Sequence, residues 1–311
     1  MGRIIGIAGQ ENTGKSFGRR YIPDGNNVMI IAPSPKTAHL FTGPKGVESM
    51  TTQEIDAAIK SGKRKPIKYF DIKSPEGKYN NLEEAMKLVN DPAKKSLLYT
   101  LHMIKLHKPK DYFIKEGIEK AREYLSGNFI LCEDIENLSF YISFIAEFMP
   151  WIHTIILPDF THFISEKITS AEFIAKKTGG EQYSKYLDLA ADSLRGFIKS
   201  ADKLRHNLIM VTEFHAHRLP ESEEIRLFLP GGKMFEEKFL PASYYDDLFF
   251  TNVRYGENED ELPQYEFITR KTKVYPQARS SSGFDELYIP NNLQEVLTQV
   301  RKYNGIEITI Q

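Results

Sequence analysis

The stretch that decides the fold lies near the start of the chain and reads Arg3-Ile4-Ile5-Gly6-Ile7-Ala8-Gly9-Gln10-Glu11-Asn12-Thr13-Gly14-Lys15-Ser16. Its first part, up to Ala8, is a short β-branched apolar run without alternation, which is typical of a central strand in a sheet covered on both faces. Its second part is a glycine-rich turn that leads into the start of a helix. A second apolar run, Val28-Met29-Ile30-Ile31-Ala32, follows it. This order predicts an α/β fold with a mostly parallel central sheet flanked by helices.

The turn from Gly9 to Ser16 matches the phosphate-binding pattern G-x-x-x-x-G-K-[ST]. Gly9 and Gly14 allow positive φ, so successive backbone N–H groups can point at one phosphate. Lys15 is expected to reach the β- and γ-phosphates, and Ser16 to offer its hydroxyl to Mg²⁺. A helix that begins after the turn would direct its positive end at the same anion. The predicted ligands are ATP and Mg²⁺, and the predicted nucleotide contacts are Gly9, Gln10, Glu11, Asn12, Thr13, Gly14, Lys15, Ser16 and Phe17.

A site of this kind also needs a carboxylate at the end of a neighbouring strand, where it holds the water shell of Mg²⁺. Asp159 fits this role because it follows the apolar run Thr154-Ile155-Ile156-Leu157. Ser16 and Asp159 are therefore the predicted metal residues. The alternative is an aspartate that simply starts the next loop, and Pro158 counts against the strand because proline removes a ladder donor.

The remaining chain alternates apolar runs with amphipathic segments. Further elements are expected as strands at 129–132 and 207–212, helices at 135–148 (capped by Asp134), at 182–204 and from Asn291/Asn292 to near Gly305, and antiparallel hairpin strands at 248–255 and 264–272. We expect one domain, 1–311, with an insertion at about 33–127 and a C-terminal hairpin-and-helix extension at 230–311.

Composition narrows the function classes. Lys plus Arg number 41 against 42 Asp plus Glu, so the formal net charge is −1 and no global field attracts nucleic acid or anionic lipid. Any such binding needs a local basic patch. The single cysteine, Cys132, excludes an internal disulfide framework and a multi-Cys zinc site. No apolar run approaches the length of a membrane span, so we expect a cytoplasmic protein with no membrane partner.

The order of these motifs resembles that of the phage-encoded RecA-like AAA-type ATPases, some of which act as single-strand annealing or recombination proteins. The resemblance covers about residues 3–32 and 128–305. It is carried by the P-loop with Glu11 in its third position, the strand ending at Asp159, the long helix after Gln182-Tyr183, the strand 208–212, Pro230-Gly231-Gly232-Lys233-Met234 and Ile289-Pro290-Asn291-Asn292-Leu293.

The resemblance implies a RecA-like P-loop core in which Lys15, Ser16 and Asp159 take the nucleotide and Mg²⁺ roles. One catalytic group does not carry over. RecA-like enzymes place a Glu at the end of the second core strand to orient the attacking water, whereas here that strand ends in Pro33-Ser34. The replacement candidates are Glu11, Asp71, Glu133 and Asp134. The last two also suit a simpler role, as carboxylates that favour a helix N-terminus.

In this family the strand after the long helix ends in a polar residue that senses the γ-phosphate. Glu213 and His215 both fit that position, and a solvated loop residue is the alternative for either. His215 and His217 would share one face of a strand, which is also metal-ligand spacing, but the sequence supplies no evident third ligand.

The resemblance also implies contact with single-stranded DNA through two loops, 160–181 and 217–234. Both contain basic residues and glycines, but their glutamates predict weak or strongly salt-dependent binding. Phe160, Phe163 and Phe173 either stack on bases or pack in the core. Two denser basic clusters, 60–65 and 105–110, lie in the insertion and are either solvated faces or a source of DNA affinity.

The resemblance also implies that subunits assemble and share a nucleotide site. Arg270 and Lys273, with Arg279 as a further candidate, resemble the cations that RecA-like subunits present to a neighbour's γ-phosphate; a charged strand edge is the alternative. The leading hypothesis is a homo-oligomeric ring or filament that hydrolyses Mg·ATP and acts on single-stranded DNA in phage recombination or replication. The alternatives are a nucleotide-gated assembly protein with little hydrolysis and a small-molecule kinase that uses the same P-loop.

Overall fold

The computed structural model describes residues 2–22, 27–33, 57, 71–72, 125–126, 128–132, 134–177, 183–202, 204–256, 258 and 262–307. The insertion expected at 33–127 falls almost wholly outside these ranges. The basic clusters 60–65 and 105–110, Glu133 and the side chain of Phe173 lie outside the described residues too.

One mixed sheet organises the described part of the chain. Its strand order is β11 (Tyr288–Pro290), β10 (Gln264–Ile268), β9 (Asp247–Arg254), β1 (Arg3–Gly9), β7 (Ile209–Arg218), β6 (Thr154–Leu157), β2 (Val28–Ala32) and β5 (Phe129–Leu131), and β8 (Ile225–Leu227) pairs with the far end of β7. The run from β9 to β5 is parallel, whereas β10, β11 and β8 are antiparallel to their neighbours. The predicted α/β class with a mostly parallel sheet is confirmed. A separate two-stranded ladder joins β3 (Asp71–Ile72) to β4 (Leu125–Ser126).

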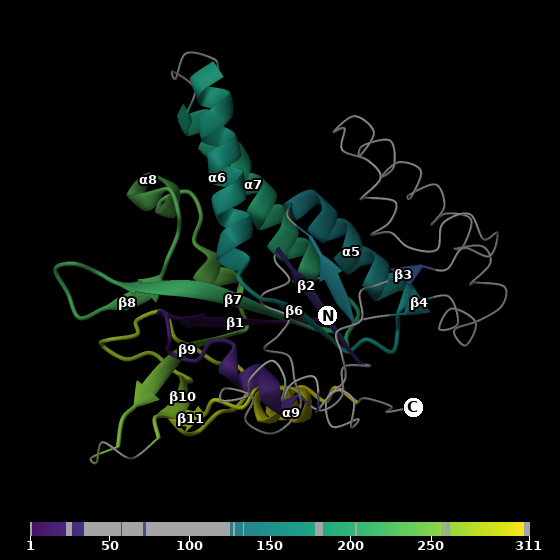
Figure 1. Cartoon of the computed structure of the whole chain (residues 1–311), viewed down its shortest axis with the longest axis vertical. Helices are drawn as coiled ribbons and strands as arrows, with labels where there is room; N and C mark the ends of the chain where they lie inside the picture. The colour runs from purple at the N-terminus through teal and green to yellow at the C-terminus, as the bar shows by residue number, and fades with distance from the viewer. Residues whose placement is uncertain are drawn as a thin grey trace.

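Helices cover both faces of this sheet (Figure 1). α5 (Ile135–Phe148), α6 (Phe160–Lys177) and α7 (Tyr183–Asp202) lie on one face, and α9 (Leu293–Tyr303) lies on the other beside the short 3₁₀ helix η1 (Phe17–Tyr21). Two further short helices, α8 (Gly232–Glu236) and η4 (Pro241–Tyr244), follow β8. In the described ranges, no helix is long and apolar enough to cross a membrane.

The apolar runs explain this layering, because successive side chains of a strand point to opposite faces. In β1, Ile4 and Ala8 join the core under α5, α6 and α7, while Ile5 and Ile7 join the core under α9. All four side chains are at most 1% exposed. The unalternating run at the start of the chain is therefore a strand buried from both sides, as its composition predicted.

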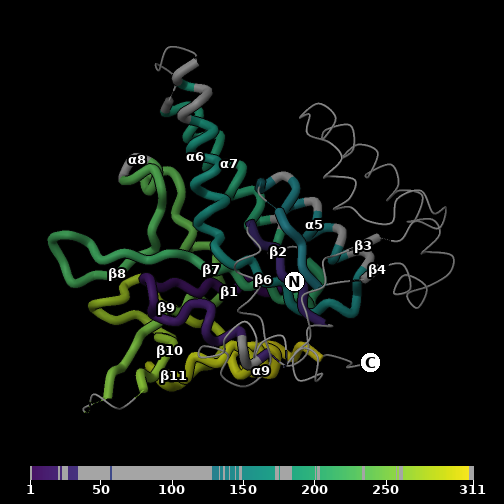
Figure 2. Tube along the Cα trace, in the orientation of Figure 1, coloured from purple at the N-terminus to yellow at the C-terminus, as the bar shows by residue number. Residues whose placement is uncertain are grey.

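Local sequence signals located several elements closely. The strands predicted at 28–32 and 154–157 are β2 and β6. Asp134 caps α5 by accepting a hydrogen bond from the Asn137 backbone N–H at 2.7 Å, which confirms its simpler role. Asn292 caps α9 in the same way. The two hairpin strands expected near the C-terminus are β9 and β10, and they extend the central sheet beside β1 (Figure 2).

Four expectations were wrong. The loop expected at 160–181 is largely the helix α6, and Phe160 and Phe163 are fully buried in the core. The loop expected at 217–234 holds the end of β7, the strand β8 and the start of α8. The strand predicted at 207–212 continues to Arg218, so Glu213, His215 and His217 lie within β7. The segment after the glycine-rich turn forms the five-residue 3₁₀ helix η1, which is too short to direct a helix dipole at an anion.

Candidate functional site

Several of the predicted site residues converge where β1 and β6 end beside the middle of β7. The parallel register sets Gly9 opposite His215 and Ile7 opposite Glu213. Leu157 pairs with Thr212, so Asp159, two residues further on, lies near the level of Glu213 and His215 in β7. The glycine-rich turn, Asp159, Glu213 and His215 therefore lie at about the same level across three adjacent strands.

Lys15 lies over the glycine-rich turn. Its Nζ donates to the carbonyl oxygens of Gly9 at 3.0 Å and Gln10 at 3.2 Å, and it lies 3.5 Å from His215 Nδ1. Burial lowers the pKa of the Lys15 ammonium, and the nearby Glu213, Asp159 and Glu11 carboxylates oppose that shift. Lys15 is thus a half-buried cation whose present partners are neutral carbonyls and an imidazole. The oxygens of a polyanion could replace these partners.

The two glycines of the turn have distinct physical roles. Gly14 has φ of +87°, a conformation that L side chains rarely adopt. Gly9 is needed for space, because a Cβ at this position would lie 1.9 Å from Thr251 Oγ1 and 2.7 Å from Thr13 Oγ1. The pattern glycines are therefore required by the shape of the turn.

This close approach at Gly9 makes a prediction about stability. Gly9→Ala is expected to lower the free energy of unfolding by about 1–3 kcal/mol, the typical cost of overpacking. The matched control is Gly196→Ala in the middle of α7, where a Cβ meets nothing within 4 Å. That change should stabilise the protein by about 0.5–1 kcal/mol, because glycine is unfavourable inside a helix. Urea denaturation of the two variants measures both effects; equal stabilities would contradict the prediction.

The C-terminal strands brace the turn from one side. Thr13 Oγ1 and Thr251 Oγ1 are 2.6 Å apart, and the rings of Phe17 and Tyr265 are 4.3 Å apart between centroids. Asn291 Nδ2 donates to the Gly14 carbonyl at 2.8 Å. Thr251, Tyr265 and Asn291 are site residues that sequence reasoning missed. Asn291 was noted only within the motif 289–293 and at the start of the last helix, because these side chains meet the turn only after β9 has paired with β1 and β10 with β9.

A buried ion pair lies beneath the turn. Arg19 Nε lies 2.8 Å from Glu213 Oε1, and the two side chains are 0% and 2% exposed. Ser16 Oγ donates to the other oxygen of Glu213 at 3.2 Å. Burial raises the pKa of the Glu213 carboxyl, and Arg19, Ser16 and Lys15 counter that shift. Ser16 thus contacts Glu213, and Arg19 is a site residue that the sequence analysis missed.

Asp159 is paired with His215. His215 Nε2 lies 3.3 Å from Asp159 Oδ1, and the His215 backbone N–H donates to Thr161 Oγ1 at 2.9 Å. Burial raises the pKa of the Asp159 carboxyl, but the hydrogen bond and charge of His215 and His162 outweigh burial and hold the pKa below its usual value. Asp159 has φ of +58° and immediately precedes α6, so its backbone makes the turn from β6 into that helix.

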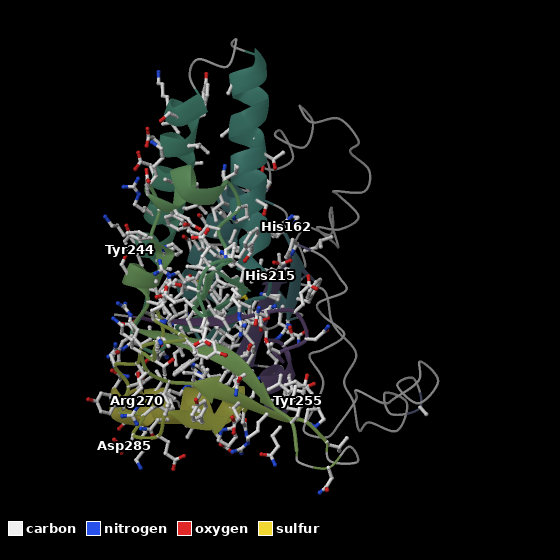
Figure 3. The ribbon with its side chains drawn as sticks, turned by 90° about the vertical axis from the view of Figure 1, so that its left-hand side faces the viewer. His162, His215, Tyr244, Tyr255, Arg270 and Asp285 are labelled. Atoms are coloured by element: carbon white, nitrogen blue, oxygen red, sulfur yellow. The ribbon has the colours of Figure 1, made fainter. Side chains whose placement is uncertain are left out.

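An open cleft of about 890 Å³ extends from the turn along β7. His162 and His215 both lie on this side of the molecule (Figure 3). The His217 ring meets the exposed Phe228 edge-on at 5.5 Å between centroids. The lining residues are Gln10, Glu11, Thr13, Asp159, Thr161, His162, Ser165, His215, Ala216, His217, Arg218 and Phe228. The cleft therefore joins Glu11, Asp159 and His215 to a basic and aromatic patch on the β7–β8 hairpin.

Other candidates lie away from this cleft. Arg270 and Lys273 are exposed residues that follow β10, and Arg270 donates to the Asp285 carbonyl (Figure 3). Arg279 donates to the backbone carbonyls of Ser243 and Tyr245. Asp71 lies in the separate β3–β4 ladder. Within one chain, none of these residues lines the cleft.

The oxygen groups at the turn fit a magnesium ion better than a transition metal. Mg²⁺ typically keeps several waters and is held by one or two carboxylates together with substrate phosphates. The Ser16 hydroxyl and the Asp159 carboxylate would supply such a set, whereas Glu213 is buried and held by Arg19 and Ser16. Over the described ranges, no three or more His, Cys, Asp or Glu side chains form a group that could hold a metal ion, so His215 and His217 have no third ligand there.

Comparison with protein-family models gives no match for this chain, and comparison with the curated proteins gives none either.

Proposed function

We propose that this protein binds Mg·ATP and hydrolyses it as a RecA-like P-loop ATPase that acts on single-stranded DNA. The observation that carries the proposal is the placement of Lys15. It lies over a glycine-rich turn at the carboxyl end of a central parallel strand, beside two adjacent strands that bring Asp159, Glu213 and His215 to the same edge.

Each group has a role in this proposal that follows from its surroundings. The backbone N–H groups of the turn and the Lys15 ammonium bind the triphosphate, and Lys15 exchanges its carbonyl partners for phosphate oxygens. The Ser16 hydroxyl donates to Glu213 and keeps its lone pairs for Mg²⁺, which supplies charge neutralisation at the phosphates. Asp159, which lines the cleft, would hold the water shell of Mg²⁺.

The geometry favours His215 over Glu213 as the group that contacts the γ-phosphate. Glu213 is buried and already held by Arg19 and Ser16. The His215 side chain is 39% exposed, lines the cleft and is oriented by Asp159. Glu11 also lines the cleft and is exposed, so it remains the candidate that could orient water from within the turn.

The proposed DNA contact uses the patch at the outer end of the cleft. Arg218 can neutralise a phosphate and the exposed Phe228 can stack on a base. Because this patch is small and the chain carries no net positive charge, the proposal predicts strongly salt-dependent binding. The exposed Arg270 and Lys273 are available to a neighbouring subunit in a ring or filament.

A second candidate is a nucleotide-gated assembly protein that retains ATP and hydrolyses it slowly. It is favoured by the absence of a carboxylate where β2 ends, since the strand stops at Ala32 and Pro33 follows. It is also favoured by the engagement of Glu213 with Arg19, which leaves no free glutamate on β7 at the turn.

One experiment separates the two candidates. ATP turnover is measured with and without single-stranded DNA, alongside size-exclusion chromatography with a non-hydrolysable ATP analogue. An ATPase acting on DNA should gain at least about tenfold in rate with DNA, and its rate per subunit should rise with protein concentration. Tight ATP retention and assembly without turnover would establish the second candidate instead. A protein that binds no nucleotide in either assay would contradict both.

A further inference from the structure

Asn291 connects the C-terminal part of the sheet to the glycine-rich turn. It directly follows β11 and is 2% exposed. Its backbone N–H donates to the Tyr265 carbonyl at 3.0 Å, which ties the residue to β10. Its Nδ2 donates to the Gly14 carbonyl at 2.8 Å. Asn291 is therefore fixed at its backbone by the sheet and reaches the turn with its side chain.

The hydrogen bond to the Gly14 carbonyl also determines where an adjacent donor points. The Gly14 carbonyl oxygen also accepts from the Phe17 backbone N–H at 2.9 Å, so two donors together fix its direction. The peptide unit that joins Gly14 to Lys15 is planar and trans, so the Lys15 N–H points opposite to the Gly14 carbonyl. Holding the carbonyl toward Asn291 therefore aims the Lys15 N–H away from Asn291.

The amide of Asn291 is poorly suited to a purely structural role. Its Oδ1 is buried and makes no hydrogen bond in the part of the chain that the structure describes. The same oxygen lies close to Gly18, where a Cβ would approach it to 2.4 Å. A buried amide oxygen without a partner is destabilising, and an apolar side chain of similar shape would avoid that cost. The buried Oδ1 therefore offsets part of the stability that the Nδ2 hydrogen bond to the Gly14 carbonyl provides.

We infer that Asn291 is a positioning residue of the phosphate site, which holds the Gly14 carbonyl so that the Lys15 backbone N–H is aimed at a bound phosphate. The inference rests on the proposed binding of a triphosphate. The hydrogen-bond donor that orients the turn would then come from the segment between β11 and α9, which is distant from the turn in the sequence.

The test compares two changes at Asn291 with one at its neighbour. Asn291→Leu removes the donor at similar volume, and Asn291→Asp replaces the donor with an oxygen that repels the Gly14 carbonyl. The control is Asn292→Asp, because aspartate caps a helix as well as asparagine does. Calorimetry measures binding of Mg·ATP and of Mg·tripolyphosphate, and the thermal midpoint is recorded without ligand.

Both Asn291 variants are expected to bind Mg·ATP and Mg·tripolyphosphate at least about tenfold more weakly, whereas Asn292→Asp binds them as the wild type does. The Asn291→Leu protein should keep or raise its thermal midpoint without ligand. A lowered midpoint with unchanged affinity would show a merely structural role and overturn the inference. Wild-type protein that fails to bind either ligand would overturn the proposed function itself, which is a distinguishable result.

Discussion

Lys15→Ala should weaken nucleotide binding strongly while leaving the fold intact. Removing one partner of a desolvated charge contact typically costs about 2–5 kcal/mol, which is a loss of about 30-fold to several thousand-fold in affinity. The fold should survive, because the Lys15 ammonium donates hydrogen bonds only to the Gly9 and Gln10 carbonyls and lies near an imidazole. The variant also loses a positive charge that offsets the buried Glu213 carboxylate. Calorimetric titration with Mg·ATP measures the affinity, and circular dichroism checks the fold.

A matched control for this variant is Lys185→Ala. Lys185 is exposed near the start of α7 and does not line the cleft. The same loss of one positive charge there should leave Mg·ATP affinity within about twofold, since exposed charges beyond a Debye length are screened. Equal loss of affinity in both variants would mean that Lys15 acts through net charge alone. Retained binding by Lys15→Ala would contradict the proposed phosphate site.

Arg19→Met should destabilise the protein more than any surface substitution. Removing one partner of a buried ion pair typically costs about 3–5 kcal/mol, because the other charge is left uncompensated. Here that charge is Glu213, which is 2% exposed. Without Arg19, burial raises the pKa of Glu213 further above its unfolded value. An acid with a raised folded pKa loses stability as the pH rises, so the defect should be larger at pH 8 than at pH 5.

Two further variants isolate the cause of this loss. Adding Glu213→Gln to Arg19→Met removes the unpaired charge and should restore much of the stability and remove the pH dependence. Arg226→Met breaks the exposed Arg226–Glu224 pair, whose side chains are 46% and 33% exposed, and should cost less than about 1 kcal/mol. Urea denaturation at pH 5 and pH 8 measures the free energy of unfolding of the wild type, of Arg19→Met, of the double variant and of Arg226→Met. A pH-independent loss in Arg19→Met would indicate lost packing rather than an unpaired Glu213.

Short-range patterns located much of the fold. The unalternating apolar runs are β1, β2 and β6, and the capping residues Asp134 and Asn292 mark the beginnings of α5 and α9. These predictions succeeded because burial periodicity and capping depend on residues close in sequence. The prediction for 160–181 failed because a loop was expected there from the resemblance alone. The segment forms the helix α6, and Phe160 and Phe163 at its start are buried in the core.

The sequence was sufficient to locate the glycine-rich turn and to name Lys15, Ser16 and Asp159, because the turn's chemistry lies in contiguous residues. Which carboxylate contacts Ser16 could be decided only by the tertiary structure. The parallel pairing of β1 with β7 brings Glu213 and Arg19 together under the turn, and the pairing of β9 beside β1 brings Thr251 and Asn291 against it. Strand order sets these contacts between distant residues, and no local pattern encodes strand order.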